Sequence, residues 1–380
     1  MNDLNTLLSL RLNLEEFDKI PPQFREYEIG SGRVKFKVPG EFEVDLTIAD
    51  EDFEKQFWFI DFRFGFKPST SSLSDSLRGY LEACVNDALN KDGLTGCYQF
   101  LHEYVLTCKI NELRRQAIQM SRKSWTGTLI VEPLHRALAI QYWTSRTPPQ
   151  GPKSWVLIAV NSGRNQKAQK GCSKPTSHLV ARWYRDNKEV ENCDVSLDDK
   201  DLSAQNLLRG VIGKHVEFIL RSVHHKLSGA SRFKNREAGM VLSISESDPT
   251  LSALTVQVGH QLTASLLIEP TTGSFVLKPH SKFTIQSEQQ LNSGRNQVED
   301  GALSLETVRC NFIEDEINRT GSRAGWLAHR PQLTSEEVRL VTRKREWTRV
   351  LWLRQSGWGE QWLVAIVLNL DGDEWWLVDT

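Results

Sequence analysis

The sequence contains one pattern twice, and this repetition limits the possible folds more than any other feature of the chain. The segment 34–48 (VKFKVPGEFEVDLTI) has the same two-strand rhythm as 254–268 (LTVQVGHQLTASLLI), 220 positions later, and 64–68 (FGFKP) has a counterpart in 275–279 (FVLKP). Tryptophans recur in the same order: Trp125 as Trp347, Trp143 as Trp362 and Trp155 as Trp375. Five matches in one order at nearly one spacing predict two copies of one structural module.

Each copy begins with two strands that have one wet face. In 34–38 and 42–48, apolar residues occupy every second position and the positions between them are mostly charged, which is the period of a half-buried antiparallel sheet. The next segment, Phe57–Phe66, is apolar at nearly every position, so we expect a central strand covered on both faces. Asp61 and Arg63 share one of those faces and are expected to pair.

Helices and further strands follow in the first copy. Apolar residues at helical spacing predict helices over 73–91, 94–120 and 203–227, with a break at Asp92–Gly93 between the first two. Four further segments are expected to be strands: 125–131, 138–143, 154–160 and 178–184. The second copy has a shorter helical part, 303–318 and 335–345, and then a strand pair whose Asp371–Gly372 turn is typical of hairpins.

These patterns predict an α+β protein of two tandem repeat modules, each a mainly antiparallel sheet packed against helices. We expect an N-terminal helix and linker over 1–30, the first module over 31–228, a linker over 229–238 and the second module over 239–380. At an offset of 220, residue 380 matches residue 160, where the first copy still has a strand and a helix to come. The second module is therefore expected to be incomplete at its C-terminus, and the chain to be a fragment of a longer protein.

Charge and hydropathy exclude some classes of partner. The chain has 47 basic and 48 acidic residues, a balance that argues against a protein held mainly by nucleic-acid phosphates or anionic lipid. Its longest apolar runs, 155–160 and 362–368, fall far short of the roughly 20 residues that span a bilayer, so no membrane partner is expected. The N-terminus lacks the apolar core of a signal peptide, and six cysteines form no C-x-x-C motif, which favours an intracellular chain.

Three short motifs resemble metal or phosphate sites but each lacks an essential part. His102–Glu103 opens like a zinc-protease helix, yet Leu106 stands where the second histidine must be. Gly210-x-x-Gly213-Lys214 has neither the spacer nor the Ser/Thr of a phosphate-binding loop. The acidic run that begins at Asp50 lacks the glycine and the bidentate glutamate of a calcium loop.

Cysteines and paired histidines give no further site. Cys97 and Cys108 share one face of a predicted helix, where buried core cysteines are the better interpretation. His224 and His225 are adjacent, hence about 100° apart on a helix and poorly placed to share one ion. The sequence therefore predicts no catalytic, cofactor-binding or metal-binding residues, and no cofactor.

Two basic patches support an alternative function, binding of nucleic acid. The patch 161–177 contains Arg164, Lys167, Lys170 and Lys174. The patch 339–349 contains Arg339, Arg343, Lys344, Arg345 and Arg349 around Trp347. Because the whole chain is neutral, a solvated loop and a solvated helix face are favoured, and direct contact with nucleic acid is not expected.

The chain has twelve tryptophans. We expect most of them, Trp155 and its counterpart Trp375 included, to lie in the core, because a repeated module reuses its core positions, and some to serve as interface anchors.

Several longer strings resemble a known family. They are Asp18-Lys19-Ile20-Pro21, Ser31-Gly32-Arg33-Val34, residues 39–44 (PGEFEV), residues 55–61 (KQFWFID), residues 93–103 (GLTGCYQFLHE), residues 109–117 (KINELRRQA) and residues 140–143 (IQYW). These strings resemble the fungal form of Mediator subunit 14. The resemblance is dense over about residues 10–160 and looser to the end.

The resemblance implies a scaffold rather than an enzyme. Members of this family join the head, middle and tail modules of the Mediator coactivator, which links activators to RNA polymerase II in the nucleus, and they carry tandem repeat modules in this region. Other Mediator subunits are the implied partners, with RNA polymerase II reached indirectly. The chain lacks the family's upstream helical segment and everything after the second module, so tail attachment would depend on regions missing here.

Overall fold

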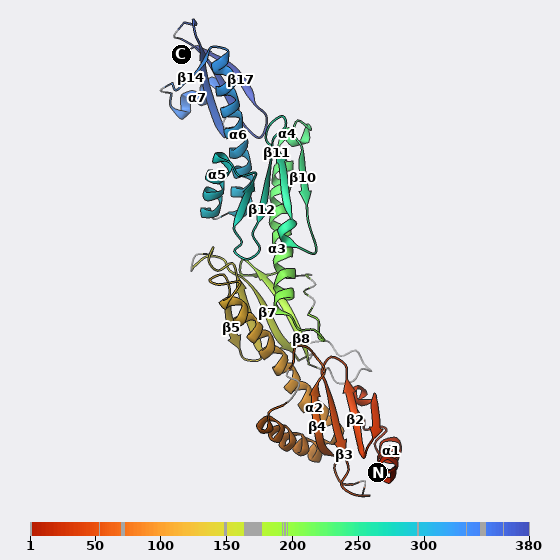
Figure 1. Cartoon of the computed structure of the whole chain (residues 1–380). Helices are drawn as coiled ribbons and strands as arrows, with labels where there is room; N and C mark the ends of the chain where they lie inside the picture. The colour runs from red at the N-terminus through yellow and green to blue at the C-terminus, as the bar shows by residue number, and fades with distance from the viewer. Residues whose placement is uncertain are drawn as a thin grey trace. The chain divides into compact units, whose positions relative to one another are not determined.

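The computed structural model describes residues 2–379 except 53, 70–72, 148–149, 163–176, 192, 194, 196, 295, 332, 343–346 and 360. The chain divides into two compact units, residues 1–208 and 209–380 (Figure 1). Helices and antiparallel sheets occur in both units, which confirms the α+β class. Among the described residues, no helix combines the length and the apolar character needed to cross a membrane.

The first unit opens with a short helix and a four-stranded antiparallel sheet in the order β1-β2-β3-β4. The elements are α1 (Asn2–Leu10), a π-helical turn (Arg11–Glu15), a 3-10 turn (Pro22–Phe24), β1 (Tyr27–Gly30), β2 (Arg33–Val38), β3 (Phe42–Thr47) and β4 (Trp58–Phe64). The predicted hairpin is confirmed, because β2 and β3 pair with Phe36 opposite Val44. Their alternate residues are buried, and Phe24 stacks on Phe36 at 4.5 Å.

The expectation of a central third strand is wrong. β4 lies at the edge of the sheet and alternates in burial: Phe59 and Phe62 face the core, while Trp58 is 42% and Ile60 37% exposed. Continuous apolar character therefore marks a strand with an exposed apolar face here, not one with neighbours on both sides. The expected pair on this strand is present, with Arg63 3.2 Å from Asp61.

One long helix connects the two sheets of the first unit. α2 (Asp75–Arg122) begins at Ser74, whose side chain accepts a hydrogen bond from the Leu77 amide, and it breaks at Gly93 with φ +58° and ψ −145°. The predicted break between two helices is thus confirmed. α2 contacts β4 and then three strands of the second sheet, so it supplies the core for both.

The second sheet of this unit is antiparallel, in the order β5-β6-β7-β8-β9. Its strands are β5 (Ile130–Leu134), β6 (Ala137–Tyr142), β7 (Ser154–Asn161), β8 (His178–Arg185) and β9 (Lys188–Glu189). Three of the four predicted strands match. The strand expected over 125–131 begins only at Ile130, because residues 123–128 form turns after the end of α2.

The second unit repeats this order of elements. They are α3 (Ala204–Ser228), which begins in the first unit, α4 (Ser231–Lys234), a 3-10 turn (Pro249–Leu251), the sheet β10 (Met240–Ser243), β11 (Ala253–Gln257), β12 (Thr263–Ile268) and β13 (Phe275–Lys278), the helices α5 (Lys282–Ser293) and α6 (Gln297–Arg323), and the sheet β14 (Trp326–His329), β15 (Arg349–Gln355), β16 (Trp362–Leu368) and β17 (Glu374–Asp379). α7 (Ser335–Thr342) lies between β14 and β15. Each sheet is followed or preceded by helices as in the first unit, and cis peptide bonds occur at Lys67–Pro68 and Lys278–Pro279.

The constant offset of 220 fails in the last sheet. β5 and β6 are joined by a two-residue turn, whereas α7 lies between β14 and β15, and the long β7–β8 connection has a short counterpart between β16 and β17. β17 is consequently the fourth strand, equivalent to β8, so the strand expected to be missing from the second copy is present. The predicted equivalence of Trp155 with Trp375 is wrong, because Trp155 lies on a third strand and Trp375 on a fourth.

The division between the units lies inside α3, ahead of the linker predicted over 229–238. Near its C-terminal end α3 belongs to the second unit, where Lys226 pairs with Glu299 of α6 at 3.0 Å. The helix thus extends from the first unit into the second, and it precedes the β10–β13 sheet as α1 precedes the β1–β4 sheet. The module ends at 228 and 380 stay predictions.

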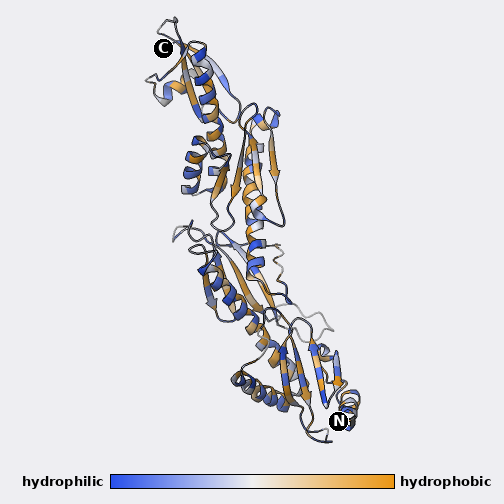
Figure 2. Ribbon diagram, viewed as in Figure 1, coloured by the Kyte–Doolittle hydropathy of each residue, from blue (hydrophilic) through white to orange (hydrophobic). Residues whose placement is uncertain are grey.

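The two tryptophans predicted to be core residues lie elsewhere. Trp155 is half-buried and stacks on Tyr184 with ring centroids 4.9 Å apart, and Trp375 is 64% exposed. The tryptophans that do lie in the core of the first unit are Trp125, Trp143 and Trp183, which are 8%, 3% and 3% exposed. Of these, Trp183 donates a hydrogen bond to the Tyr142 hydroxyl at 2.8 Å. Figure 2 shows the apolar residues along the strands and helices of both units, interrupted by polar faces.

Candidate interaction surfaces

The first sheet turns a charged face away from α2. Its register places Glu28 beside Lys35, and Lys35 beside Asp45. Arg33 Nη1 lies 3.1 Å from Asp45 Oδ2, and Lys37 Nζ lies 2.6 Å from Glu28 Oε1. The hydrogen bond between these last two raises the pKa of Lys37 and lowers the pKa of Glu28.

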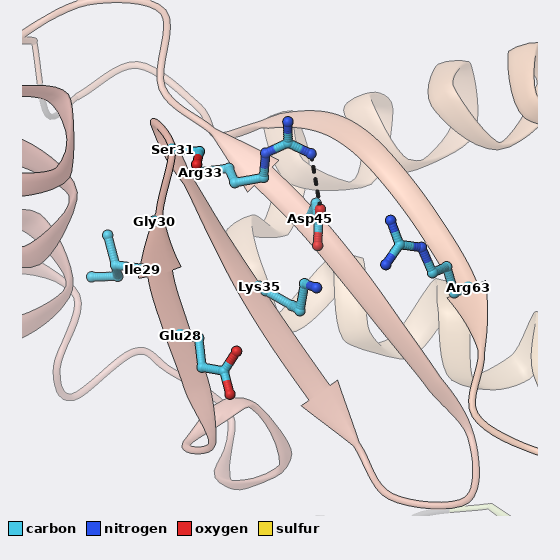
Figure 3. Close-up of a pocket in the computed structure, with 8 residues that line it drawn as sticks. All are labelled: Glu28, Ile29, Gly30, Ser31, Arg33, Lys35, Asp45 and Arg63. Carbon is cyan, nitrogen blue, oxygen red and sulfur yellow. Dashed lines mark hydrogen bonds and ion pairs between the residues drawn. The ribbon is translucent and has the colours of Figure 1, made fainter. Parts of the chain in front are cut away.

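A shallow hollow of about 340 Å³ lies on this face (Figure 3). It is lined by Glu28, Ile29, Gly30, Ser31, Arg33, Lys35, Asp45 and Arg63. In Figure 3 the side chains of Lys35 and Arg63 lie on either side of the Arg33–Asp45 ion pair. Cations and carboxylates that alternate in this way suit recognition of a polar protein surface. The exposed Lys37–Glu28 pair contributes little stability, whereas the Arg33–Asp45 pair includes a carboxylate that is 6% exposed.

The second sheet of the first unit has an apolar face on the side away from α2. Ile130 is 44% and Leu134 53% exposed at the β5 edge. The register continues this face through Gln141 to the Trp155–Tyr184 stack. Exposed apolar side chains gathered on a rigid sheet are characteristic of protein contact surfaces.

The second unit exposes apolar residues on β17. Trp375 is 64% and Leu377 61% exposed, and the register pairs them with Ile366 and Val364 of β16. Their neighbour Trp376 is half-buried on the opposite face. The β17 strand thus carries the most exposed tryptophan among the described residues.

Buried polar residues hold these surfaces in place, and the first such group surrounds His102 of α2. Nδ1 lies 2.7 Å from Glu41 Oε2 in the β2–β3 turn, and Nε2 lies 2.7 Å from the Ser177 carbonyl oxygen before β8. Both neighbours are acceptors, so both hydrogen bonds are made only when the ring is protonated and donates at both nitrogens. Burial acts to lower the pKa of His102, but the hydrogen bond to Glu41 and the Glu41 charge outweigh it, and the net pKa is raised.

The second group surrounds Arg309 of α6, whose side chain is 3% exposed. It donates to Glu306 of the same helix, with Nε 2.7 Å from Oε2, and to both carboxylate oxygens of Asp373 at 2.9 and 2.8 Å. A further hydrogen bond reaches the Asn369 carbonyl at 3.1 Å. Burial acts to lower the pKa of Arg309, but these carboxylates raise it overall. The group fixes the β16–β17 turn against α6.

The structure describes only a few basic residues of the two predicted basic patches. Arg164, Lys167, Lys170 and Lys174 lie outside the described residues, as do Arg343, Lys344 and Arg345. Arg339 is exposed on α7. Arg349 is half-buried and pairs with Glu314 at 2.5 Å, so its charge is already compensated within the protein.

The motifs that resembled metal or phosphate sites have structural roles. His102 belongs to the polar group above, and Cys97 of the same helix is buried in the core. Gly210 and Gly213 lie within α3. Asp50 forms an ion pair with Lys55 in an exposed turn. No cluster of three metal-ligating side chains occurs in the described part of the chain.

Sequence reasoning missed both buried polar groups. His102 and Glu41 are 61 residues apart, and Arg309 and Asp373 are 64 apart. Only Arg309 and Glu306, at i and i+3, carry a local signal. Side chains that meet only in the folded structure are not separated by a regular spacing in the sequence. Neither buried group could therefore be located from the spacing of its residues.

Comparison with known proteins gives matches along the whole chain. A family profile described as "Mediator complex subunit MED14" matches residues 1–50, and one described as "Fungal Med14 domain" matches residues 223–317. Proteins named "Mediator of RNA polymerase II transcription subunit 14" align over 100% of this chain in Pyricularia oryzae at 45% identity, in Neurospora crassa at 44% and in Aspergillus niger at 36%.

The aligned part is 34%, 31% and 33% of these relatives, so the chain spans about a third of their length. The matches extend through both units, including the β14–β17 sheet that neither family profile reaches. The relatives are named as subunits of a transcription complex and not as enzymes. From the alignments and the two profiles together, this chain belongs to the family of Mediator subunit 14, in its fungal form.

Proposed function

We propose that this chain is part of a structural scaffold subunit of the Mediator coactivator complex and supports regulated transcription by RNA polymerase II. The observation that carries the proposal is alignment over the entire chain, at 34–45% identity, with proteins named as Mediator subunit 14. Under this proposal the protein acts in the nucleus and is not an enzyme.

The surfaces described above support a scaffold. Rigid sheets carry exposed apolar side chains in both units, and the first sheet adds a charged face. Obligate assemblies commonly bury more than about 2,000 Å² per interface through such apolar patches. The buried ionisable groups at His102 and Arg309 join helices to strand turns, which is a structural use of charge.

We infer that the partners are other Mediator subunits of the head and middle modules, with the tail attached through regions outside this chain. RNA polymerase II is then reached indirectly. The modules we propose for this scaffold are residues 31–228 and 239–380.

Affinity purification of the tagged full-length protein tests the proposal. We expect head and middle subunits to copurify at moderate salt, and deletion of residues 31–228 to separate the complex. The matched variant changes Arg164, Lys167, Lys170 and Lys174 together to Ala and should leave the assembly mostly intact. Loss of copurification in the charge variant but not in the deletion would replace the scaffold with a charge-driven binding module.

The alternative of a nucleic-acid-binding module, with the patches 161–177 and 339–349, is tested by filter binding to duplex DNA across a salt series. Phosphate contacts give a steep fall of affinity with salt. We expect weak binding without that slope, because Arg349 is already paired with Glu314.

A further inference from the structure

Residues 198–203, here called the strap, lead into α3 and lie beside Lys67, which follows β4. The Lys67 amide donates to the Lys200 carbonyl at 2.8 Å, and the Lys67 carbonyl accepts from the Leu202 amide at 2.7 Å. These two hydrogen bonds make an isolated parallel bridge and not part of a ladder. The strap is therefore attached to the first sheet much more loosely than a strand of that sheet is.

Helix α2 holds the end of the strap through Gln116. The side-chain amide nitrogen of Gln116 donates to the Leu202 carbonyl at 3.0 Å, and its oxygen accepts from the amide of Ala204, the first residue of α3, at 2.9 Å. Leu202 is 1% and Ala204 0% exposed. The strap thus places the first turn of α3, which belongs to the first unit, against α2.

An ion pair of unequal burial joins the strap to the middle of α2. Lys109 Nζ lies 3.0 Å from Asp199 Oδ1, and the lysine side chain is 2% exposed while that of the aspartate is 67% exposed. The ammonium also lies 5.7 Å from the centre of the Phe66 ring. A buried charge that loses its partner is costly, because water does not replace the missing counter-charge. Asp199 should therefore matter more for the fold than an acid in an ordinary surface ion pair does.

The strap itself has the features of a segment with low local stability. Residues 198–201 are four consecutive exposed residues, and Leu202 is the buried residue of the strap. The part of α2 beneath it belongs to the core, with Ile110 7% and Leu113 0% exposed. Segments with few buried apolar contacts and exposed backbone hydrogen bonds open without unfolding of the whole domain. The strap can thus open while α2 stays folded.

We propose that the strap is a releasable latch, locked by the Lys109–Asp199 pair, that keeps the first turn of α3 on α2. When the strap is seated, Asp199 neutralises the buried ammonium. When the strap opens, water reaches Lys109 and takes the place of the counter-charge, so the open state leaves no buried charge unpaired. The balance between the two states consequently depends on the charge at position 199. This conformational device goes beyond the proposed scaffold function and does not depend on it.

Hydrogen exchange of the purified 380-residue chain, measured by mass spectrometry, tests the inference. In the wild-type protein the amides of 200–204 should exchange faster than those of α2 around Leu113, because the strap opens locally. Asp199→Asn should speed exchange over 200–208 at least about tenfold, because the seated state then buries an uncompensated ammonium. Lys109→Met combined with Asp199→Asn should bring exchange back towards the wild-type rate, because the buried charge is gone.

Asp201→Asn is the matched control, because Asp201 is an exposed acid on the same strap, and it should leave exchange unchanged. Trypsin gives a second measurement: cleavage after Lys200 should increase in Asp199→Asn and stay at the wild-type level in Asp201→Asn. Exchange of 200–204 as slow as that of α2, or equal effects of the two variants, would overturn the inference. Equal acceleration of the strap and of α2 in Asp199→Asn would also overturn it, because the pair would then stabilise the whole unit.

Discussion

The two units join helix to sheet with buried ionic groups of different chemistry. In the first unit the group is the His102 imidazolium, which bridges the β2–β3 turn and the start of β8. In the second it is the Arg309 guanidinium, which bridges α6 and the β16–β17 turn. A histidine loses its charge near neutral pH, whereas an arginine does not. Two units of the same architecture therefore connect helix to sheet through different ionic groups. Near neutral pH, only the stabilisation from the His102 group is expected to depend on pH.

Removing the Arg309 charge should have the largest effect. Arg309→Ala leaves Glu306, with a side chain 2% exposed, without its paired guanidinium and with the more distant charge of Arg232 nearby. Breaking a buried ion pair in this way commonly costs about 3–5 kcal/mol. We expect a marked fall in the denaturation midpoint, measured by urea titration. Arg309→Leu combined with Glu306→Leu should recover most of the loss, because a well-packed apolar pair replaces the ions. If the double variant stays as unstable as Arg309→Ala, the hydrogen bonds of Arg309 to the β16–β17 turn, and not the neutralisation of Glu306, are what stabilises this part of the fold.

A smaller loss is expected at His102. His102→Ala removes two hydrogen bonds, one of them to the Glu41 carboxylate, and such charged bonds are each worth about 1.5–3 kcal/mol. Glu41 is less buried than Glu306, with 19% of its side chain exposed, so water compensates part of the loss. In the same denaturation assay at pH 6, we expect His102→Ala to lower the unfolding free energy by less than Arg309→Ala does. The reverse order would contradict the comparison of the two groups.

The pH dependence separates the two groups directly. Because the pKa of His102 is raised on folding, its stabilisation is fully present below the unfolded pKa of about 6.5 and is lost as pH rises through the folded value. Glu41, Glu103, the Ser177 carbonyl and the ring of Tyr98 surround it, and they favour the charged form or are neutral.

The measurement is hydrogen exchange of the β2–β3 turn and of α2 around residue 102, followed from pH 6 to 9 after correction for intrinsic exchange. Protection in the first unit should fall with pH, and protection of the β16–β17 turn should not. His102→Ala should remove the pH dependence. An equal fall in both units would show that the titration of His102 does not cause it.

An exposed ion pair provides the lower limit of the comparison. Lys37 and Glu28 approach to 2.6 Å but are 38% and 68% exposed, so Lys37→Ala should leave the denaturation midpoint almost unchanged. A loss as large as that of His102→Ala would mean that burial does not explain why the His102 and Arg309 groups stabilise the fold more than an exposed ion pair does.

Elements with a local signal could be predicted from the sequence. The alternation in 34–48 located β2 and β3, and Asp92–Gly93 located the break in α2, because period and glycine act on their own neighbours. The edge position of β4 was not predictable in this way, since hydropathy records burial but not which strand lies alongside. The offset of the repeat failed where connections changed length, and this misassigned Trp375. The pairs of His102 and Arg309 depend on the fold itself.

The positive φ at Gly93 also governs which substitutions that position tolerates. A Cβ atom added there would have no heavy atom within 4 Å, so side-chain volume imposes no restriction. The backbone angles do, because φ +58° with ψ −145° lies outside the left-handed helical region that asparagine and aspartate tolerate, in a region that essentially only glycine adopts. A saturation library at this position would thus separate glycine from every other residue, asparagine and aspartate included, whatever the size of the side chain.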